Sequence, residues 1–218
     1  MNNTNFLIES YLQGEEYAID AYFNDQGKTV ILNILKHDFA GTEDVSDRLY
    51  YTSKQIIQKN LGRMQLFLEQ CNELFGLKNF PVHVEVRIDE TGVIIPIEFN
   101  PLRFAGLCTT DISYFAYGFK TYEMYLRNKA PNWDELLADK DGLRYSAVIL
   151  STDGNALSDS YSFNFDSLKH SFSKVLTTRV FDAKRYNLFG MLFVETPEKE
   201  AQKEAEFILN VDLNEFLS

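Results

Sequence analysis

Cysteines, basic residues and long hydrophobic runs are all scarce in this sequence. Two cysteines, Cys71 and Cys108, occur in 218 residues, too few for a disulfide framework and without the spacing of a metal site. No run of about 18 apolar residues is present, which excludes a membrane-spanning helix. The first ten residues do not resemble a signal peptide, and reduced thiols are typical of the cytosol, so we expect a cytoplasmic protein.

Basic residues are also fewer than acidic residues. The sequence has 21 lysines and arginines against 32 acidic residues, a formal net charge of −11 and a pI near 4.8. Such a surface repels phosphate backbones and anionic lipid headgroups, so neither nucleic acid nor a membrane is an expected partner. An anion site inside one cleft stays compatible with this balance. With 45% hydrophobic and 14% aromatic residues, the chain can bury an ordinary core.

Alternating and helical patterns predict an α+β fold with an antiparallel sheet and flanking helices. Residues 15–23 alternate as in a half-buried strand, and residues 29–35 return as a second strand after a turn. Residues 36–51 are polar and irregular and predict a loop. Apolar residues recur at helical spacing over residues 53–75, and Gly76 predicts the end of that helix.

The clearest hairpin joins residues 82–89 to residues 93–100. Because the side chains of a strand alternate between its faces, we expect one face to join the core. The expected core positions are Val82, Val84, Val86, Ile88, Val93, Ile95, Ile97 and Phe99. The other face carries the polar side chains, which are His83, Glu85, Arg87, Glu98 and Asn100. In either register that a turn with an even number of residues allows, Glu85 and Glu98 lie on the same face, directly across the two strands or diagonal to each other.

The facing carboxylates of Glu85 and Glu98 repel each other unless a proton, a cation or an arginine intervenes. Together with Asn100 they are hard oxygen donors that suit Mg²⁺, which keeps its remaining positions for water and phosphate oxygens. The alternative is a solvated strand face in which the two glutamates form ion pairs with His83 and Arg87. Spacing alone leaves both interpretations open.

The spacing of these acids resembles the metal-binding end of the ATP-grasp family. Glu98 follows Glu85 by 13 residues, Asn100 follows Glu98 by two, and Pro101 comes next. In that family a carboxylate on one strand and a Glu-x-Asn sequence on the next hold the Mg²⁺ ions that bridge the phosphates of ATP. The resemblance implies that Glu85, Glu98 and Asn100 bind Mg²⁺ (or Mn²⁺), with ATP as the nucleotide.

Basic residues near these acids would contact the phosphates in such a site. The family places an arginine soon after the asparagine, where it stabilises the transferring group, and Arg103 is the candidate here, three residues after Asn100. His83 stands where some relatives carry a basic residue near the γ-phosphate, although a histidine on a polar strand is more often simply hydrogen-bonded. Lys36, at the end of the second predicted strand, is a further candidate for a phosphate contact.

Residues 6–17, upstream of and entering the first strand, resemble the ATP-grasp hinge. That hinge is a strand ending in glutamate, a short linker, a glycine and a second glutamate, and Glu9, Gly14 and Glu16 stand in this order. The resemblance implies that the adenine meets Glu9 and the backbone of Ser10, Tyr11 and Leu12. It also implies that Glu16 accepts hydrogen bonds from the ribose hydroxyls. Taken alone, these glutamates would fit an ordinary acidic surface.

The resemblance covers residues 5–125, and we expect an ATP-grasp lobe over residues 1–130 followed by a small α+β extension over residues 131–218. The elements predicted in the extension are strands over residues 145–150, 179–182 and 188–195 and helices over residues 165–176 and 197–209. No catalytic motif stands out in this extension.

No glycine-rich phosphate loop precedes the hinge or occurs elsewhere in the sequence. We therefore expect a fragment with the second lobe of a two-lobed enzyme, inactive alone and able to self-associate through the apolar surface that the first lobe would cover. The resemblance implies that the parent is a ligase, which uses ATP to activate a carboxylate as an acyl phosphate for an amine or similar nucleophile. The alternative is a non-catalytic binding or interaction module, in which the aromatic residues 114–122 would serve a partner.

Overall fold

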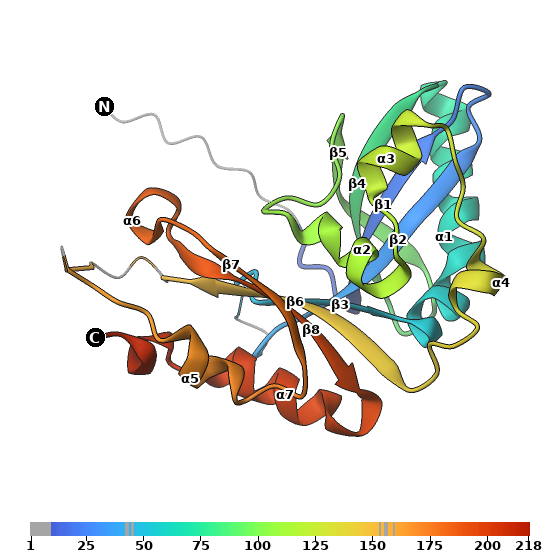
Figure 1. The fold of residues 1–218 in the computed structure, drawn as a ribbon. Coiled ribbons are helices and arrows are strands. Elements are labelled where there is room, and N and C mark those ends of the chain that lie inside the picture. The colour runs from blue at the N-terminus through green and yellow to red at the C-terminus, as the bar shows by residue number, and fades with distance from the viewer. Residues whose placement is uncertain (1–9, 42–43, 45, 153, 155–156, 159) are drawn as a thin grey trace, which may run out of the picture.

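The computed structural model describes residues 10–41, 44, 46–152, 154, 157–158 and 160–218. Eight strands form one sheet in the order β5-β4-β1-β2-β3-β6-β8-β7, and all neighbours are antiparallel (Figure 1). The strands are β1 (Glu15–Phe23), β2 (Thr29–Asp38), β3 (Leu49–Ser53), β4 (Phe80–Ile88), β5 (Ile94–Pro101), β6 (Leu143–Ser151), β7 (Val175–Val180) and β8 (Leu188–Pro197). The predicted α+β class with an antiparallel sheet and flanking helices is confirmed.

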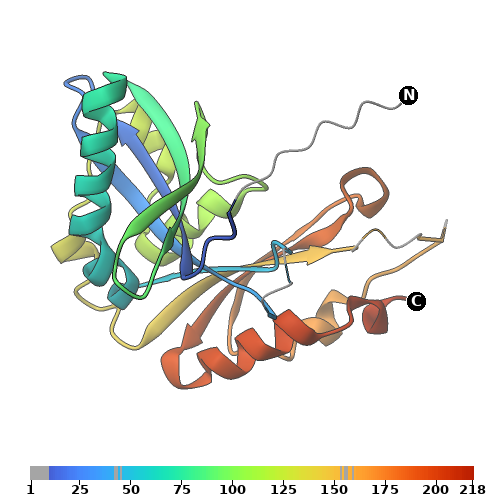
Figure 2. The ribbon, with the colours of Figure 1, turned by 180° about the vertical axis from the view of Figure 1, so that it is seen from behind.

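Helices flank the sheet on both faces. They are α1 (Lys54–Phe75), α2 (Ile112–Tyr117), α3 (Thr121–Leu126), α4 (Trp133–Leu136), α5 (Phe165–Lys169), α6 (Ala183–Tyr186) and α7 (Glu198–Asn210), with 3-10 turns η1 (Thr109–Asp111) and η2 (Leu213–Phe216). Figure 2 shows α1 lying along one face of β1, β2 and β4, whereas α2 and α3 lie on the face seen in Figure 1. Helix α7 packs against β6 and β8. Within the described part of the chain, no helix has the length and apolar character needed to cross a membrane.

Helix α1 begins and ends at the residues that the sequence predicts. The hydroxyl of Ser53 accepts a hydrogen bond from the Ile56 amide, and Gly76 ends the helix with a left-handed backbone, φ 65°. The buried stripe of α1 comprises Ile56, Ile57, Asn60, Met64, Leu68 and Asn72. The two caps and this stripe explain why the helix has these limits.

Strand β1 is buried on both faces from Tyr17 onward, whereas its alternation predicts a half-buried strand. Ile19 lies in the same cross-strand row as Phe99, whose ring packs against Phe67 of α1. The even-numbered side chains face the other way, and the chain after β5 folds back over part of them. Tyr22, for example, is covered by residues 104–125.

Residues 36–51 do not form the single loop that the sequence predicts. Strand β2 extends to Asp38, and β3 pairs with both β2 and β6. Strand β3 is difficult to predict because its five residues, Leu-Tyr-Tyr-Thr-Ser, do not alternate. Because β3 connects β2 to β6, the strands after residue 131 continue the same sheet. The predicted boundary between an ATP-grasp lobe over residues 1–130 and an extension over residues 131–218 stays a prediction.

The predicted helix over residues 165–176 is much shorter in the structure. Helix α5 ends at Lys169, and β7 begins at Val175 as the edge strand beside β8. The run Val-Leu-Thr-Thr-Arg-Val of β7 is rich in β-branched residues, which favour a strand over a helix.

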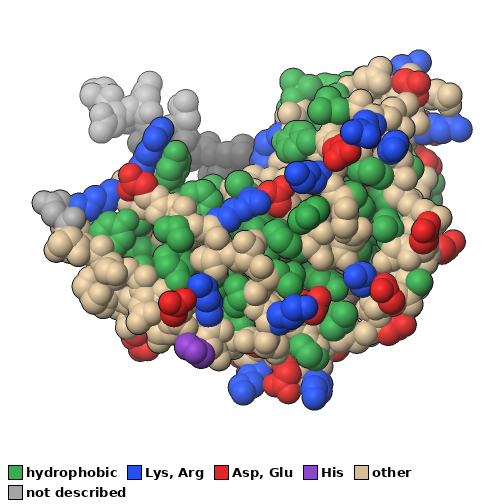
Figure 3. All heavy atoms as spheres, viewed as in Figure 1, with side chains coloured by type: hydrophobic (Ala, Val, Ile, Leu, Met, Phe, Trp, Pro, Cys, Tyr) green, Lys and Arg blue, Asp and Glu red, His purple; other side chains and the backbone are tan. Residues whose placement is uncertain are grey.

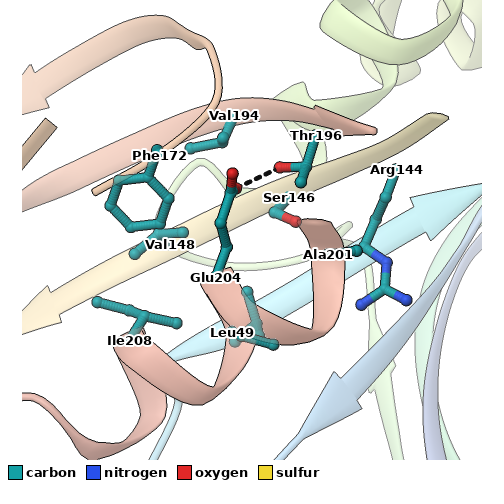
Figure 4. Close-up of a pocket in the computed structure, with 11 residues that line it drawn as sticks. Leu49, Arg144, Ser146, Val148, Phe172, Val194, Thr196, Ala201, Glu204 and Ile208 are labelled. Carbon is teal, nitrogen blue, oxygen red and sulfur yellow. Dashed lines mark hydrogen bonds between the residues drawn. The ribbon is translucent and has the colours of Figure 1, made fainter. Parts of the chain in front are cut away.

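Buried Glu204 connects α7 to the sheet by hydrogen bonds (Figure 4). Oε2 of Glu204 accepts a hydrogen bond from the Thr196 hydroxyl at 2.6 Å, and Oε1 accepts one from the Ser173 amide at 2.7 Å. The cavity beside this carboxylate has a volume of about 10 Å³, space for one water molecule. This cluster therefore stabilises the packing of α7 and leaves no room for a ligand.

Candidate functional site

The polar face of the β4–β5 hairpin brings the predicted acids together. Glu85 pairs with Glu98, and His83 pairs with Asn100, as in one of the two expected registers. The turn itself has a different register, in which Ile88 pairs with Ile94, and a β-bulge makes up the difference. The two carboxylates therefore lie on adjacent strands and on the same face, with the amide of Asn100 next along β5.

A β-bulge beside Glu85 changes which apolar side chains of β5 face the core. Past the bulge, Arg87 pairs with Ile95, so Ile95 lies on the polar face with Ile97 beside it. The expected core positions Val93, Ile95 and Ile97 are wrong, because Ile95 lies on the polar face and Val93 and Ile97 are 54% and 42% exposed. One inserted residue in β5 reverses the facing of the β5 side chains between it and the turn, and no residue pattern in β5 predicts this. The result is an apolar wall beside the charged face.

One row of charged side chains crosses the sheet at the start of β1. Glu16 has Arg87 of β4 and His37 of β2 as its cross-strand neighbours. Nε and Nη2 of Arg87 lie 3.1 and 2.9 Å from Oε2 of Glu16, and Nδ1 of His37 lies 2.9 Å from Oε1. Nε2 of His37 is buried with no hydrogen-bond partner in the described structure, and its ring stacks on Tyr50. No sequence motif marks His37; only its position opposite Glu16 could have indicated it.

A second polar row crosses the sheet four residues further along β1. Asp20 is fully buried and pairs with His83 of β4 and Asn33 of β2. Nδ1 of His83 donates to Oδ1 of Asp20 at 2.8 Å, and Nε2 of His83 lies 3.2 Å from Oε1 of Glu85. Sequence analysis missed Asp20, because one acid in an alternating strand is typical of a solvated face. On the face of the molecule that Figure 3 shows, by contrast, acidic and basic side chains are mixed.

His83 carries a positive charge at neutral pH in this row. Burial alone lowers the pKa of the imidazole, but the hydrogen bonds and negative charges of Asp20 and Glu85 outweigh burial and raise the pKa of His83 to about 9. The hydrogen bond from His83 in turn lowers the pKa of Glu85, against the effect of its partial burial. In this row the positively charged His83 lies between the carboxylates of Asp20 and Glu85 and keeps Glu85 ionised.

Asp20 also fixes the loop that follows β5. Its carboxylate accepts hydrogen bonds from the Ala105 amide at 2.8 Å and from the Thr110 hydroxyl at 2.6 Å. Three residues other than glycine have left-handed backbones in this loop, namely Leu102, Leu107 and Cys108, with φ of 60°, 48° and 67°. Such conformations cost roughly 1–3 kcal/mol each, persist only where neighbouring contacts enforce them, and cluster at ligand sites.

The loop and the hairpin line a pocket of about 200 Å³. Arg103 lines it together with His83 and Glu85, and Nη2 of Arg103 lies 4.0 Å from Oε1 of Glu98. Its apolar lining includes Ala105, Leu107 and Ile149. Ile149 belongs to β6, so the C-terminal strands contribute to this pocket.

A second pocket, of about 410 Å³, lies at the other end of the polar face. It is lined by Ser10, Tyr11, Leu12, Glu16, Arg87, Ile95, Pro96 and Ile97. The pocket therefore brings the predicted hinge residues 10–12 and Glu16 together with the apolar side chains of Ile95 and Ile97 in β5. Glu9, the remaining predicted adenine contact, lies outside the described residues.

Comparison with protein-family models finds a match to the ATP-grasp domain over residues 1–111. The chain belongs to the ATP-grasp family. The matched residues include both the hinge segment and the hairpin with Glu85, Glu98 and Asn100. No curated protein matches the chain by sequence at a significant level.

Solved structures share the ATP-grasp fold at low sequence identity. An L-amino acid ligase from Bacillus licheniformis is 15% identical, with a TM-score of 0.66 over 95% of this chain and 54% of that one. The phosphoribosylaminoimidazole carboxylase ATPase subunit from Aquifex aeolicus is 15% identical, with a TM-score of 0.60 over 93% and 57%. A biotin carboxylase from Campylobacter jejuni, in complex with beta-gamma-ATP, is 12% identical, with a TM-score of 0.58 over 87% and 43%. This chain spans about half the length of these proteins.

The donors on the ATP-grasp hairpin fit a magnesium ion that a nucleotide also binds. Glu85 and Glu98 are cross-strand neighbours, and Asn100, two residues after Glu98 on the same strand, adds an amide oxygen as a third donor. In the same part of the chain, no three His, Cys, Asp or Glu side chains lie close enough to hold a metal ion by themselves. Mg²⁺ is typically held by one or two carboxylates together with substrate phosphates, so this donor set fits it.

Lys36 does not lie on the polar face with the other predicted site residues. It pairs with Tyr17 of β1 and so lies on the face of the sheet that α1 covers. Its ammonium group lies 2.8 Å from Oε1 of Glu15 and 3.6 Å from Oδ1 of Asp38. The next residue, His37, occupies the polar face instead. The phosphate contact predicted for Lys36 stays a prediction, and its placement gives that prediction no support.

Proposed function

We propose that this ATP-grasp chain forms the ATP- and Mg²⁺-binding part of a ligase that activates a carboxylate as an acyl phosphate for an amine or a similar nucleophile. The observation that carries the proposal is the polar face of the sheet. A pocket lined by the hinge residues lies at one end of this face, and Glu85, Glu98 and Asn100 lie further along it with Arg103 beside them.

Each part of a nucleotide has matching chemistry on this face. The apolar wall of Ile95 and Ile97 suits a planar base, and the backbone of residues 10–12 supplies donors and acceptors for its edge. The carboxylate of Glu16 suits the ribose hydroxyls as an acceptor. The acids of the hairpin would hold Mg²⁺, which would neutralise charge developing on the phosphates.

Arg103 and His83 supply positive charge at the phosphate end. In the proposed reaction a substrate carboxylate oxygen attacks the γ-phosphorus, ADP leaves, and the amine then displaces phosphate from the acyl phosphate. The planar guanidinium of Arg103 can bind two phosphoryl or carboxylate oxygens at once. The imidazolium of His83, held by Asp20, adds a fixed charge beside Glu85. Both groups act by electrostatic stabilisation, which dominates catalysis of phosphoryl transfer.

Calorimetric titration of the chain with ADP, with and without Mg²⁺, tests the proposal. Glu98→Gln removes one proposed metal ligand, and Glu123→Gln removes an acid whose side chain is equally exposed, at 53%. We expect binding that requires Mg²⁺, that is about tenfold weaker or more in Glu98→Gln, and that is unchanged in Glu123→Gln.

The outcomes of this titration separate the two functions. ADP binding that ignores both Mg²⁺ and Glu98→Gln would contradict the metal assignment. No binding under any condition would favour a non-catalytic interaction module, for which large exposed apolar side chains such as Leu74, Leu102 and Leu126 provide contact surface.

A further inference from the structure

Arg87 connects three separate parts of the nucleotide end of the sheet. From its place on β4, Nε and Nη2 donate to Oε2 of Glu16 at 3.1 and 2.9 Å, and Nη1 donates to the carbonyl oxygen of Leu12 at 2.8 Å. Glu16 belongs to β1, and Leu12 to the hinge segment before it. One guanidinium therefore fixes a strand side chain and the backbone of the hinge relative to β4.

Glu16 is held from both sides before any ligand arrives. Oε2 accepts hydrogen bonds from Arg87, and Oε1 lies 2.9 Å from Nδ1 of His37. The side chains of Glu16 and Arg87 are only 12% and 18% exposed. Immobilising a free glutamate side chain is unfavourable because rotamer entropy is lost. In this site that loss is part of folding, so a ligand that hydrogen-bonds to Glu16 does not incur it again.

The shape of the arginine side chain matters as much as its charge. Its guanidinium lies 5.5 Å from the ring centroid of Tyr11 and 5.8 Å from that of Phe39. The planar fork of arginine can bond to a carboxylate and a carbonyl together while its faces contact rings, whereas lysine presents a single nitrogen. Ile95, directly opposite Arg87 on β5, continues the lining of the same pocket.

We propose that Arg87 is the positioning residue of the nucleotide site. It holds the carboxylate of Glu16 where a ribose hydroxyl can donate to it, and it holds the hinge carbonyl of Leu12 at the edge of the base pocket. This inference rests on the proposed function, because it requires a nucleoside diphosphate in the 410 Å³ pocket. Arg87 acts through Glu16 and Leu12 and needs no contact with the phosphates.

The test compares ADP with 2′-deoxy-ADP and 3′-deoxy-ADP, each titrated calorimetrically in the presence of Mg²⁺. Wild-type protein is expected to bind ADP about tenfold more tightly than the deoxy analogue that lacks the hydroxyl bonded to Glu16. In Arg87→Gln, ADP binding is expected to weaken about tenfold, and the preference for ADP over that analogue is expected to fall close to one. Loss of a purely structural contact would weaken all three ligands equally and leave the preference unchanged.

Two further variants complete the test. Arg144→Gln is the matched control, because Arg144 is also largely buried, at 16% exposed, and also forms an ion pair, at 2.9 Å with Glu198, but on β6 away from this pocket. It is expected to bind all three nucleotides as the wild type does. Arg87→Lys keeps the positive charge but lacks the planar guanidinium. We expect this variant to be folded, as measured by circular dichroism, and to lose most of the preference for ADP over the deoxy analogue.

Three results would overturn the inference, and they differ from one another. An unchanged preference in Arg87→Gln would show that Arg87 does not position Glu16, with the nucleotide site itself intact. A full preference in Arg87→Lys would show that charge alone suffices. Wild-type protein that binds none of the three nucleotides would overturn the proposed function and this inference together.

Discussion

Asp20 and His83 face each other across β1 and β4, with Oδ1 of Asp20 2.8 Å from Nδ1 of His83 and both residues buried. Burying two charges is unfavourable unless the remaining polar atoms also find partners. Here His83 meets Glu85 through its second nitrogen, and Asp20 accepts hydrogen bonds from Ala105 and Thr110. The pair therefore joins the first strand, the acidic hairpin and the loop after it into one unit.

Replacing Asp20 with alanine is expected to lower the free energy of unfolding by about 3–5 kcal/mol, because buried Nδ1 of His83 and the Ala105 amide lose their acceptor. Urea unfolding at neutral pH measures the change. Asp166→Ala is the control, since Asp166 forms an exposed ion pair with Lys169 at 3.1 Å, and its loss is expected to be below about 1 kcal/mol. Equal losses in the two variants would contradict the role assigned to Asp20.

The same pair makes stability depend on pH. The pKa of His83 is raised from 6.5 to about 9 in the folded protein, so the folded state binds this proton more tightly than the unfolded state. The protonation of His83 therefore adds about 3 kcal/mol to the free energy of unfolding. This stabilisation is fully present below pH 6.5 and is lost as the pH rises through 9. Urea unfolding of wild type and His83→Gln, in EDTA, should show a difference at about pH 6 that largely disappears by about pH 10. A difference that does not change with pH would refute this linkage.

The features that sequence predicts correctly are those set by local rules. Glu85 and Glu98 share a face as the alternation of the two strands predicts, although the register next to the turn, where Ile88 pairs with Ile94, reaches this pairing only through the bulge in β5. Helix α1 has its caps, Ser53 and Gly76, at its own ends, and its limits are correspondingly accurate. The ATP-grasp resemblance depends on the same short-range spacings.

The features that sequence misses depend on contacts between distant segments. Asp20 bonds to residues 85 and 90 positions later in the chain, and nothing near it in sequence reports that the loop returns. Strand β3 is short and finds its neighbours in β2 and β6, and the bulge in β5 reverses Ile95 and Ile97 through a single residue. In each case the deciding interaction lies outside the window that a pattern can span.

Gly14 controls how the hinge segment enters β1. Its φ is +119°, and a Cβ there would overlap the carbonyl oxygen of Ile88 at the end of β4. Gly76 also has a positive φ, of +65°, but has open space around it, so Gly76→Ala is expected to cost about 1 kcal/mol of backbone strain. Gly14→Ala is expected to cost clearly more in thermal unfolding and to weaken ADP binding, because residues 10–12 must shift. Equal losses in the two variants would contradict the role assigned to the close approach of Gly14 to Ile88.

Lys36 and Glu16 test which face of the sheet binds the nucleotide. The side chains lie on opposite faces at neighbouring register positions of β1 and β2, since Glu16 pairs with His37 and Lys36 pairs with Tyr17. Glu16→Gln is expected to weaken the binding of ADP with Mg²⁺ about tenfold, because a charged acceptor for the ribose is lost. Lys36→Gln is expected to change that affinity by less than about twofold, because Lys36 bonds to Glu15 on the face covered by α1. A loss of affinity in Lys36→Gln as large as that in Glu16→Gln would mean that Lys36 reaches the phosphates, and the assignment of the two faces would then be wrong.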